Sequence, residues 1–352
     1  MKEETINDLI CPIVVNDKTR QACGGGLVAE VVTEHGNEIL NGFLTCKTCG
    51  VKYPIIEGVL IIWPEIEVYI KDNCVNIIRA VGKKNIHKEI DGYFKAVLKS
   101  DYSQLTKDLS KRTGNFADEN QYCLYYYDDL RSVNSSPVFD ALIEKYLDHN
   151  SYKILEDSVK QLNTKGKTAI DIGCNVGGVS HFLSGHYDFV YGIDASYKNV
   201  LDANMINRWV PEKKDWYSLT ARNRNIKRTI TVDKADNTEF IVASGRNLPF
   251  KNKSKSLSVL SNVIDITAKN FFVISEAIRM LKPDGRLFLS YVPGFRSIEG
   301  ADKKLSISPE NLKKTFPQID FYQVDEEVPF FLRISRNHFN LYSNTCMIGK
   351  SL

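Results

Sequence analysis

The sequence predicts an α/β fold built on a mostly parallel sheet, and three observations lead to this prediction. From residue 167 onward, short apolar runs alternate with segments of helical periodicity. A glycine-rich turn, DIGCNVGG at residues 171–178, joins the first apolar run to the first helical segment. The last helical segment ends in LKPDG at residues 281–285, which combines helix-ending and turn residues. Such alternation places helices over the faces of a parallel sheet.

The same patterns give the expected elements of this sheet. Strands are predicted at 167–172, 188–193, 239–243, 257–262 and 285–291, and helices at 177–184, 196–208 and 269–281. The tail VPFFLRISRNHFNLYSNTCMIGK, residues 328–350, is expected to form the last antiparallel strands. Sheets of this kind bind ligands at the carboxyl ends of their strands, where the glycine-rich turn lies.

Two regions are expected to precede the α/β domain, which we place at residues 166–352. Residues 1–64 contain four of the eight cysteines, a run of three glycines and short β-like runs, and they predict a small β domain. Residues 65–165 show helical periodicity, for example at 140–147 and 154–159, and they predict a helical connector or lid.

Composition narrows the class of protein. The chain has 352 residues, of which 43% are hydrophobic and 25% charged, as expected for a water-soluble protein with a full core. Its net charge of +3 is too small to indicate a nucleic-acid partner. It has no apolar run long enough for a membrane span, and its first residues do not resemble a signal peptide. We therefore expect a cytoplasmic protein without a membrane partner.

The glycine-rich turn indicates which nucleotide the sheet binds. No lysine follows Gly178, so the turn is not a phosphate-binding P-loop, and the G-x-G-x-x-G spacing of dinucleotide sites is also absent. Asp171 puts a carboxylate into the turn, which disfavours a pyrophosphate and suits a ligand with an ammonium group. S-adenosylmethionine is such a ligand. Asp194, at the end of the next strand, can accept both ribose hydroxyls.

Residues 167 to about 294 resemble a class I S-adenosylmethionine-dependent methyltransferase. Five motifs in order carry the resemblance: AIDIGCNVGG, VYGIDAS, VASGRNLPF, VLSNVIDIT and AIRMLKPDGRLFLSYVPG. The resemblance implies a Rossmann-like, seven-stranded sheet that is mostly parallel and has an antiparallel last strand. It also implies that the first motif binds the methionine and ribose portions, the second the ribose and the third the adenine, while the fourth lines the floor. The residues concerned are Asp171, Gly173, Cys174, Asn175, Gly177, Asp194, Ala195, Ser244, Gly245 and Asn262.

The third and fourth motifs depart from the family pattern. Ser244 stands where an aspartate usually faces the adenine amino group, and a neutral hydroxyl gives the weaker hydrogen bond. The stretch after LPF, residues 251–258, lacks the usual acidic residue at the start of the strand. These departures leave open a weakly active or inactive protein.

The four cysteines of the first fifty residues predict a metal site. Cys46 and Cys49 form a Cys-x2-Cys pair that can direct two thiolates at one ion, and Cys11 and Cys23 are candidates for the other two ligands. Four thiolates close a tetrahedral zinc site, so the ion would be structural. A β unit that has lost its metal is the alternative.

The same region resembles the zinc ribbon of activator subunits of tRNA and protein methyltransferases. Cys11-Pro12, the Cys-x2-Cys pair, and YPI at residues 53–55 followed by Gly58 carry this resemblance. It departs from the pattern in the insertion between Cys11 and Cys23. The resemblance implies that a protein partner could bind through the ribbon.

Methyl transfer from a sulfonium is an in-line displacement, which requires alignment and exclusion of water more than a strong base. Asp265 and Tyr291 follow the fourth and fifth strands and are candidates to orient or deprotonate the acceptor. The tail loosely resembles the closing segment of bacterial methyltransferases related to the mercaptohistidine N-methyltransferase domain. This implies a small amino-acid-like or peptide acceptor, with His338 assisting deprotonation and Arg333 and Arg336 holding a carboxylate. A helix cap is the alternative role of Asp265, and solvated arginines and a core histidine are the alternatives for the tail.

Two further segments bear on the substrate. The aromatic run Tyr125–Tyr127 is a candidate lid over the cofactor, with an ordinary packed helix as the alternative. The basic run at 221–228 and the lysines Lys251, Lys253 and Lys255 could contact phosphates, although a solvated face is the more frequent role of such charges.

The sequence therefore favours a methyltransferase that acts on a nitrogen or oxygen of a small metabolite, amino-acid-like or peptide acceptor. One alternative is an rRNA or tRNA methyltransferase, because large-subunit rRNA guanine methyltransferases also place a zinc ribbon before such a domain. The other alternative is a cofactor-binding scaffold protein with weak or no activity.

Overall fold

The computed structural model describes residues 1–16, 21–99, 101–107, 141, 149–162, 164, 167–209, 214–221, 224–230, 232–267, 269–294, 307–335 and 338–352. The chain divides into two compact units. The amino-terminal unit consists of Met1–Gly114, Ile193–Asn204 and Glu239–Lys251, and the carboxyl-terminal unit consists of Asn115–Gly192, Met205–Thr238 and Asn252–Leu352.

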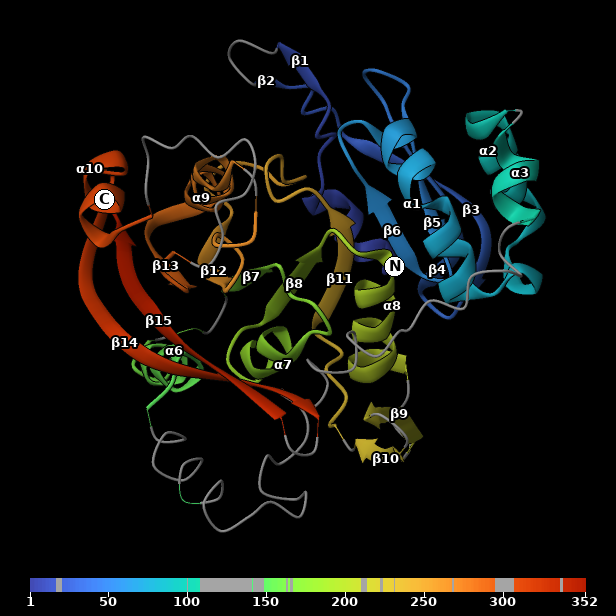
Figure 1. Ribbon diagram of the computed structural model, residues 1–352. Helices are drawn as coiled ribbons and strands as arrows, with labels where there is room; N and C mark the ends of the chain where they lie inside the picture. Colours follow the sequence, from blue (N-terminus) through green and yellow to red (C-terminus); the bar gives the residue numbers. More distant parts are fainter. Residues whose placement is uncertain are drawn as a thin grey trace. The chain divides into compact units, whose positions relative to one another are not determined.

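Strands of the amino-terminal unit follow one another in a meander to which one later strand is added (Figure 1). The strand order is β11-β6-β5-β4-β3, in which β3 to β6 are antiparallel neighbours and β11 pairs in parallel with β6. The strands are β1 (Val14–Asn16), β2 (Gln21–Ala22), β3 (Leu27–His35), β4 (Glu38–Cys46), β5 (Lys52–Ile56), β6 (Val59–Ile62) and β11 (Thr238–Ala243). The helices are η1 (Glu3–Asp8), α1 (Ile66–Val81), η2 (Lys83–Asn85), α2 (Lys88–Leu98), α3 (Asp101–Lys107) and α8 (Tyr197–Asn204).

The carboxyl-terminal unit contains the strand order β14-β15-β13-β12-β7-β8. Strands β7, β12 and β13 are parallel, whereas β15 is antiparallel to β13 and to β14. The strands are β7 (Thr168–Ile172), β8 (Phe189–Asp194), β9 (Lys214–Ala221), β10 (Arg224–Ile230), β12 (Lys255–Ser261), β13 (Leu281–Tyr291), β14 (Ile319–Ser335) and β15 (His338–Ser351). The helices are α6 (Ser151–Lys160), α7 (Gly178–Ser184), η5 (Met205–Trp209), α9 (Asn270–Arg279) and α10 (Pro309–Thr315).

Apolar side chains of α6 and α7 build the core of this unit with the sheet. Ile154, Leu155 and Val159 of α6 and Val179 and Leu183 of α7 belong to one buried cluster, which the strands complete. Burying each such side chain contributes about 1.5–3 kcal/mol. Helix α6 begins where Asn150 accepts a hydrogen bond from the Lys153 N–H at 2.9 Å, a typical helix cap.

The expected α/β fold is confirmed, including the long antiparallel ribbon of β14 and β15, drawn in red in Figure 1. Several boundaries differ from the expectation, among them the start of β14, at Ile319 rather than Val328. The helix expected at 196–208 is α8 followed by the short π-helical segment η5. Strand β13 begins at Leu281 rather than at Gly285, and the four residues from Lys282 to Gly285 bulge out between the paired residues Leu281 and Arg286. The turn signal in LKPDG therefore marks a bulge inside a strand.

None of the helices in the described ranges has both the length and the apolar composition that crossing a membrane requires.

Candidate functional site

The glycine-rich turn between β7 and α7 has a left-handed backbone at three positions. Gly173 has φ +82°, Asn175 has φ +49° and Gly177 has φ +87°. The Gly177 N–H donates to the Cys174 carbonyl at 2.8 Å, which closes the turn before α7 begins at Gly178. The two glycines therefore stand where residues with a Cβ atom would be strained.

Asp171, at the end of β7, is used inside the protein. Its side chain is 1% exposed, and its Oδ2 accepts a hydrogen bond from the Ser180 Oγ of α7 at 2.7 Å. This bond joins the strand that precedes the turn to the helix that follows it. Asp171 is thus placed to position the turn through Ser180.

The turn packs tightly against the segment that follows β12. A Cβ atom on Gly173 would lie 2.2 Å from Cγ2 of Val263, which is far inside van der Waals contact. Neighbouring Asn262 also has a left-handed backbone, with φ +52°, and its N–H donates to the Ser290 carbonyl at 2.8 Å. The first and fourth motifs therefore meet in this unit.

Asn344 of β15 completes this region, and sequence reasoning missed it. It is fully buried, and its Nδ2 donates to Oδ1 of Asn262 at 2.9 Å. Its own Oδ1 has no hydrogen-bond partner among the described residues. The amide of Asn344 at the start of the mostly apolar run NTCMIG was the signal available in the sequence.

The predicted acceptor residue Asp265 is hydrogen-bonded to the residue that follows Tyr291, the second such residue. Oδ2 of Asp265 accepts from the N–H of Val292, the residue after Tyr291, at 3.1 Å. Oδ1 of Asp265 has no hydrogen-bond partner in the described part of the chain. Burial raises the pKa of both side chains, and the Val292 N–H partly offsets this effect at Asp265.

The third predicted catalytic residue, His338, begins β15 and pairs through its backbone with Ser335. The side chains of His338 and Arg333 lie outside the described residues, as does all of Arg336.

The second motif, in the amino-terminal unit, places Asp194 at a helix start. Oδ1 of Asp194 accepts from the Ser196 N–H at 2.8 Å and from Nδ2 of Asn199 at 3.4 Å. These bonds fix the carboxylate at the tip of β8. Ser196 caps α8, since its Oγ accepts from the Asn199 N–H at 3.3 Å, and Asp194 holds the residue that caps the helix.

Two tyrosines that sequence reasoning missed support the Asp194 tip. Tyr69 of α1 donates to the carbonyl of Ala195 at 2.7 Å, and Tyr197 of α8 donates to the carbonyl of Ile56 at 2.9 Å. Burial, and secondarily the charge of Asp194, raise the pKa of Tyr69. The helical region after residue 65 thus contributes to the candidate cofactor site.

The third motif is attached to the amino-terminal segment of the same unit. Ser244 is 5% exposed, and its Oγ accepts from the Arg246 N–H at 3.3 Å. Nδ2 of Asn247 donates to the Pro12 carbonyl at 2.9 Å, and the Ile10 N–H donates to the Pro249 carbonyl at 2.9 Å. The loop that contains Ser244 and Gly245 therefore rests on the segment that contains Cys11.

The four predicted metal ligands come together. The sulfur atoms of Cys11, Cys23, Cys46 and Cys49 all lie within 4.8 Å of one another, with 3.6 Å between Cys11 and Cys49 and 3.8 Å between Cys23 and Cys46. Gly25 allows this approach, because a Cβ there would lie 2.7 Å from Sγ of Cys46.

The Cys46 thiol is surrounded by hydrogen-bond donors. The N–H groups of Thr48 and Cys49 point at its Sγ at 3.4 and 3.5 Å. Burial opposes its ionisation, but these donors, together with hydrogen bonds from the thiols of Cys49 and Cys11, outweigh burial and lower its pKa to about 7. Burial raises the pKa of Cys11 and of Cys23. Of Cys11, Cys23 and Cys46, Cys46 therefore ionises most readily.

One residue proposed to contact phosphates cannot do so. Lys255 is 2% exposed, and its Nζ lies 4.1 Å from the ring centroid of Tyr191. Lys251 and Lys253 are exposed, as expected for solvated charges. The candidate lid Tyr125–Tyr127 and the side chains of the basic run at 221–228 lie outside the described residues.

Part of the α/β domain matches a known protein family. Residues 170–289 match the family described as a methyltransferase domain. The match covers about a third of the 352 residues and extends from β7 into β13, so it includes the glycine-rich turn, Asp194, Ser244 and Asn262. The α/β fold of the chain is methyltransferase-like, as the motifs predicted.

Solved structures of similar fold have low sequence identity. The YcgJ protein from Bacillus subtilis is 13% identical, with 57% of this chain and 97% of that chain covered and a TM-score of 0.40. A complex of the Haloferax volcanii Trm112 methyltransferase activator with a methyltransferase is 14% identical, with 61% of this chain and 94% of that chain covered and a TM-score of 0.39. An S-adenosylmethionine-dependent methyltransferase from Methanosarcina mazei is 18% identical, with 62% of this chain and 99% of that chain covered and a TM-score of 0.36. No curated protein matched the sequence.

Proposed function

We propose that this protein transfers a methyl group from S-adenosylmethionine to a small metabolite, amino-acid-like or peptide acceptor. The observation that carries this proposal is the match of residues 170–289 to methyltransferase domains, which contains both acidic strand ends. When bound, the cofactor supplies an electrophilic methyl group. The protein's own task is to bind the cofactor, to align the acceptor and to exclude water.

The residues present suit a cationic, phosphate-free nucleoside derivative. The turn at 171–178 presents backbone groups but no lysine, and Asp171 holds it in place through Ser180. Asp194 would bind the ribose hydroxyls, with its carboxylate fixed by Ser196 and Asn199. Ser244 and Gly245 would contact the adenine. In the carboxyl-terminal unit, the turn and Asn262 would hold the methionine portion.

The acceptor would meet buried polar atoms that follow β12 and lie in the middle of β15. Oδ1 of Asp265 and Oδ1 of Asn344 need hydrogen-bond donors, because an unsatisfied buried acceptor costs about 1–3 kcal/mol. An amine or hydroxyl of the acceptor is such a donor. Asp265 would orient this group and, where the acceptor must lose a proton, accept that proton.

We also propose that the four cysteines bind a structural zinc ion. A tetrahedral zinc with bonds of about 2.3 Å places its sulfurs about 3.8 Å apart, which agrees with the sulfur distances in the cluster. All four ligand positions are then filled by protein, so the ion would take no part in chemistry. Its role would be to fix the segment Leu9–Pro12 that supports the Ser244 loop.

The cofactor assignment predicts a graded loss of affinity at Asp194. Asp194→Ala removes both the proposed ribose acceptor and the hydrogen-bond acceptor of the Ser196 N–H. It is expected to weaken S-adenosylmethionine binding at least about 100-fold in calorimetry. Asp194→Asn keeps an oxygen for the Ser196 N–H but loses the charge, so a loss of about tenfold is expected. Ser196→Ala is the matched control, because it alters the helix start alone and should change affinity by less than about threefold.

Unchanged affinity in Asp194→Ala would refute the ribose assignment. Binding of NAD or ATP in preference to S-adenosylmethionine would refute the proposed function itself. Tight cofactor binding without methyl transfer to any amine, amino acid or peptide in an unbiased screen would indicate a scaffold protein.

Asp265→Asn is expected to increase stability at neutral pH and to slow methyl transfer. Burial raises the folded-state pKa of Asp265 above its unfolded value. Ionising this carboxyl therefore costs more free energy in the folded protein than in the unfolded chain, which lowers stability at high pH. The stability advantage of Asp265→Asn should therefore grow as pH rises from the unfolded pKa of about 3.9 through the raised folded value. We expect about 1 kcal/mol at the plateau, measured as a pH series of thermal midpoints.

Asp72→Asn, which removes an exposed carboxylate of α1, is the control, and its effect on stability should stay within about 0.5 kcal/mol. A stability difference between Asp265→Asn and the wild type that does not change with pH would contradict the assignment of Asp265 as a desolvated carboxylate.

A further inference from the structure

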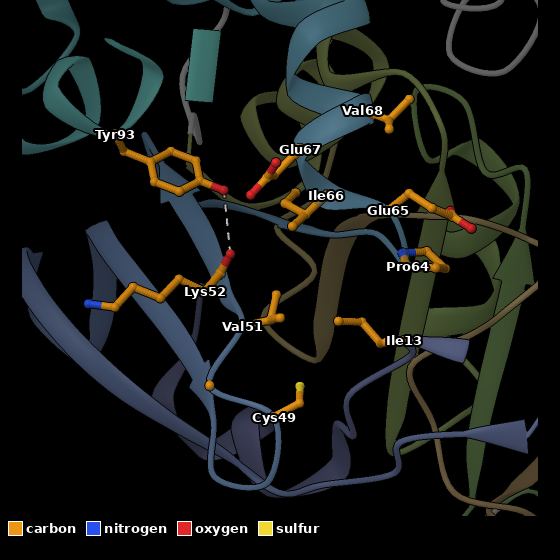
Figure 2. A pocket seen from close by; sticks show the side chains of 11 residues that line it. Ile13, Cys49, Val51, Lys52, Pro64, Glu65, Ile66, Glu67, Val68 and Tyr93 are labelled. Carbon is orange, nitrogen blue, oxygen red and sulfur yellow. Dashed lines mark hydrogen bonds between the residues drawn. The ribbon is translucent and has the colours of Figure 1, made fainter. Parts of the chain in front are cut away.

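A cavity of about 570 Å³ lies in the amino-terminal unit, and none of its lining residues is among those assigned above to cofactor or acceptor (Figure 2). It lies between the Cys-x2-Cys loop, the end of β6 and the first turn of α1. Its lining residues are Ile13, Cys49, Gly50, Val51, Lys52, Pro64, Glu65, Ile66, Glu67, Val68 and Tyr93. The volume is in the range of ligand sites and exceeds that of one side chain.

The inner surface of the cavity is apolar. Ile13, Val51, Pro64 and Ile66 line it, and Figure 2 shows Ile13 and Val51 pointing into the space below the start of α1. Val68 is 54% exposed at the rim, which is high for a valine in a folded unit. The cavity thus offers aliphatic contact to a ligand.

The charge at the rim is negative. Glu65 and Glu67 are both exposed, whereas the ammonium group of Lys52 is bound to Glu30 at 2.8 Å. In Figure 2 the Lys52 side chain extends away from the cavity. The lining residues, all of which the structure describes, therefore include two carboxylates, those of Glu65 and Glu67, and one cation, Lys52, which is already paired with Glu30.

Tyr93 adds an aromatic wall beside Glu67. Its hydroxyl donates to the Lys52 carbonyl at 3.5 Å, and its ring packs edge-on against Phe43 with 5.4 Å between centroids. Burial, and then the charge of Glu67, raise the pKa of Tyr93 to about 12. A cation between Glu67 and this ring would gain both ionic and cation–π attraction.

We propose that this cavity docks a peptide segment that carries lysine or arginine beside an aliphatic side chain. The aliphatic side chain and the methylene stem of the basic residue would fill the apolar interior, and the basic head would lie between Glu67 and Tyr93. A nucleic acid is disfavoured here, because its phosphates would face the two carboxylates. The proposal does not depend on methyl transfer.

The test uses the full-length protein and three fluorescein-labelled hexapeptide mixtures. Each mixture has leucine at the third position and arginine, glutamine or glutamate at the fourth, with the other positions varied. In fluorescence anisotropy the arginine mixture should bind about tenfold more tightly than the glutamate mixture at low salt, and about 0.5 M salt should reduce this difference.

Variants of the rim residues locate the binding. Glu67→Gln should weaken the arginine mixture about threefold, and Glu65→Arg combined with Glu67→Arg should reverse the preference towards glutamate. Val68→Ser should weaken all three mixtures. Glu34→Arg, a matched charge reversal on the exposed side of β3, should have no effect. Thermal midpoints verify that each variant is folded.

Equal affinity for the arginine and glutamate mixtures would overturn the proposal, as would absence of binding by all three. An unchanged preference in the double charge reversal would also overturn it. A labelled RNA oligonucleotide that binds equally to the wild type and to the double charge reversal would show that RNA does not bind in this cavity, as the proposal expects.

Discussion

Replacing Cys46 with serine is expected to release the metal from the cysteine cluster and to destabilise the β region around it by on the order of 5 kcal/mol. Structural zinc sites of small domains contribute apparent binding free energies of about 10–16 kcal/mol near neutral pH, and losing one of four thiolates removes a large part of this. Cys46 is the most sensitive position, because the N–H groups of Thr48 and Cys49 stabilise its thiolate.

The effect should reach the cofactor. Cys11 lies between Ile10 and Pro12, and both neighbours are hydrogen-bonded to the loop that contains Ser244. If the cluster opens, this support is lost with it. We expect Cys46→Ser to bind S-adenosylmethionine at least about tenfold more weakly than the wild type, and a strong chelator to have the same effect on the wild type.

Cys74→Ser is the matched control for this experiment. Cys74 is a fully buried cysteine of the same unit that does not belong to the cluster. Its replacement should cost stability but leave one zinc ion per chain in elemental analysis. Wild-type protein without bound metal, or a Cys46→Ser variant with unchanged metal content, would contradict the zinc assignment.

The sequence was sufficient for the parts of the fold that depend on local pattern. Apolar runs, glycines and helix-ending residues gave β7, α7, β12 and α9 to within a few residues, and cysteine spacing gave the four sulfur atoms that the fold brings together. These features depend on short-range periodicity and on side-chain chemistry, both of which are visible in one sequence.

The sequence was insufficient where a residue acts through a distant partner. Tyr69 reaches Ala195 across 126 positions, and Asn344 reaches Asn262 across 82. Lys255 was grouped with solvated lysines because its neighbours are polar, but β12 places it inside the core against Tyr191. Strand direction and register decide such contacts, and a motif does not contain them.

Gly173→Ala tests the packing of the glycine-rich turn and is expected to cost about 3 kcal/mol of stability. Alanine at this position would have to adopt a left-handed backbone with φ +82°. Its methyl group would also lie 2.2 Å from Cγ2 of Val263 and collide with it. Because valine is stiff at χ1, either Val263 or the turn has to move. Since the turn is the proposed contact for the methionine portion, S-adenosylmethionine affinity should fall at least about tenfold.

Two further variants separate the backbone strain from the collision. Gly185→Ala, at the end of α7, has φ −72° and no atom closer than 3.5 Å to the added Cβ, so its stability should stay within about 0.5 kcal/mol of the wild type. Adding Val263→Ala to Gly173→Ala removes the colliding methyl groups and leaves the backbone strain. The double variant should therefore recover about 1–2 kcal/mol relative to the sum of the single variants, measured by a double-mutant cycle of thermal unfolding. Strict additivity would show that the collision with Val263 does not limit this turn, and the cost of Gly173→Ala would then lie in its backbone alone.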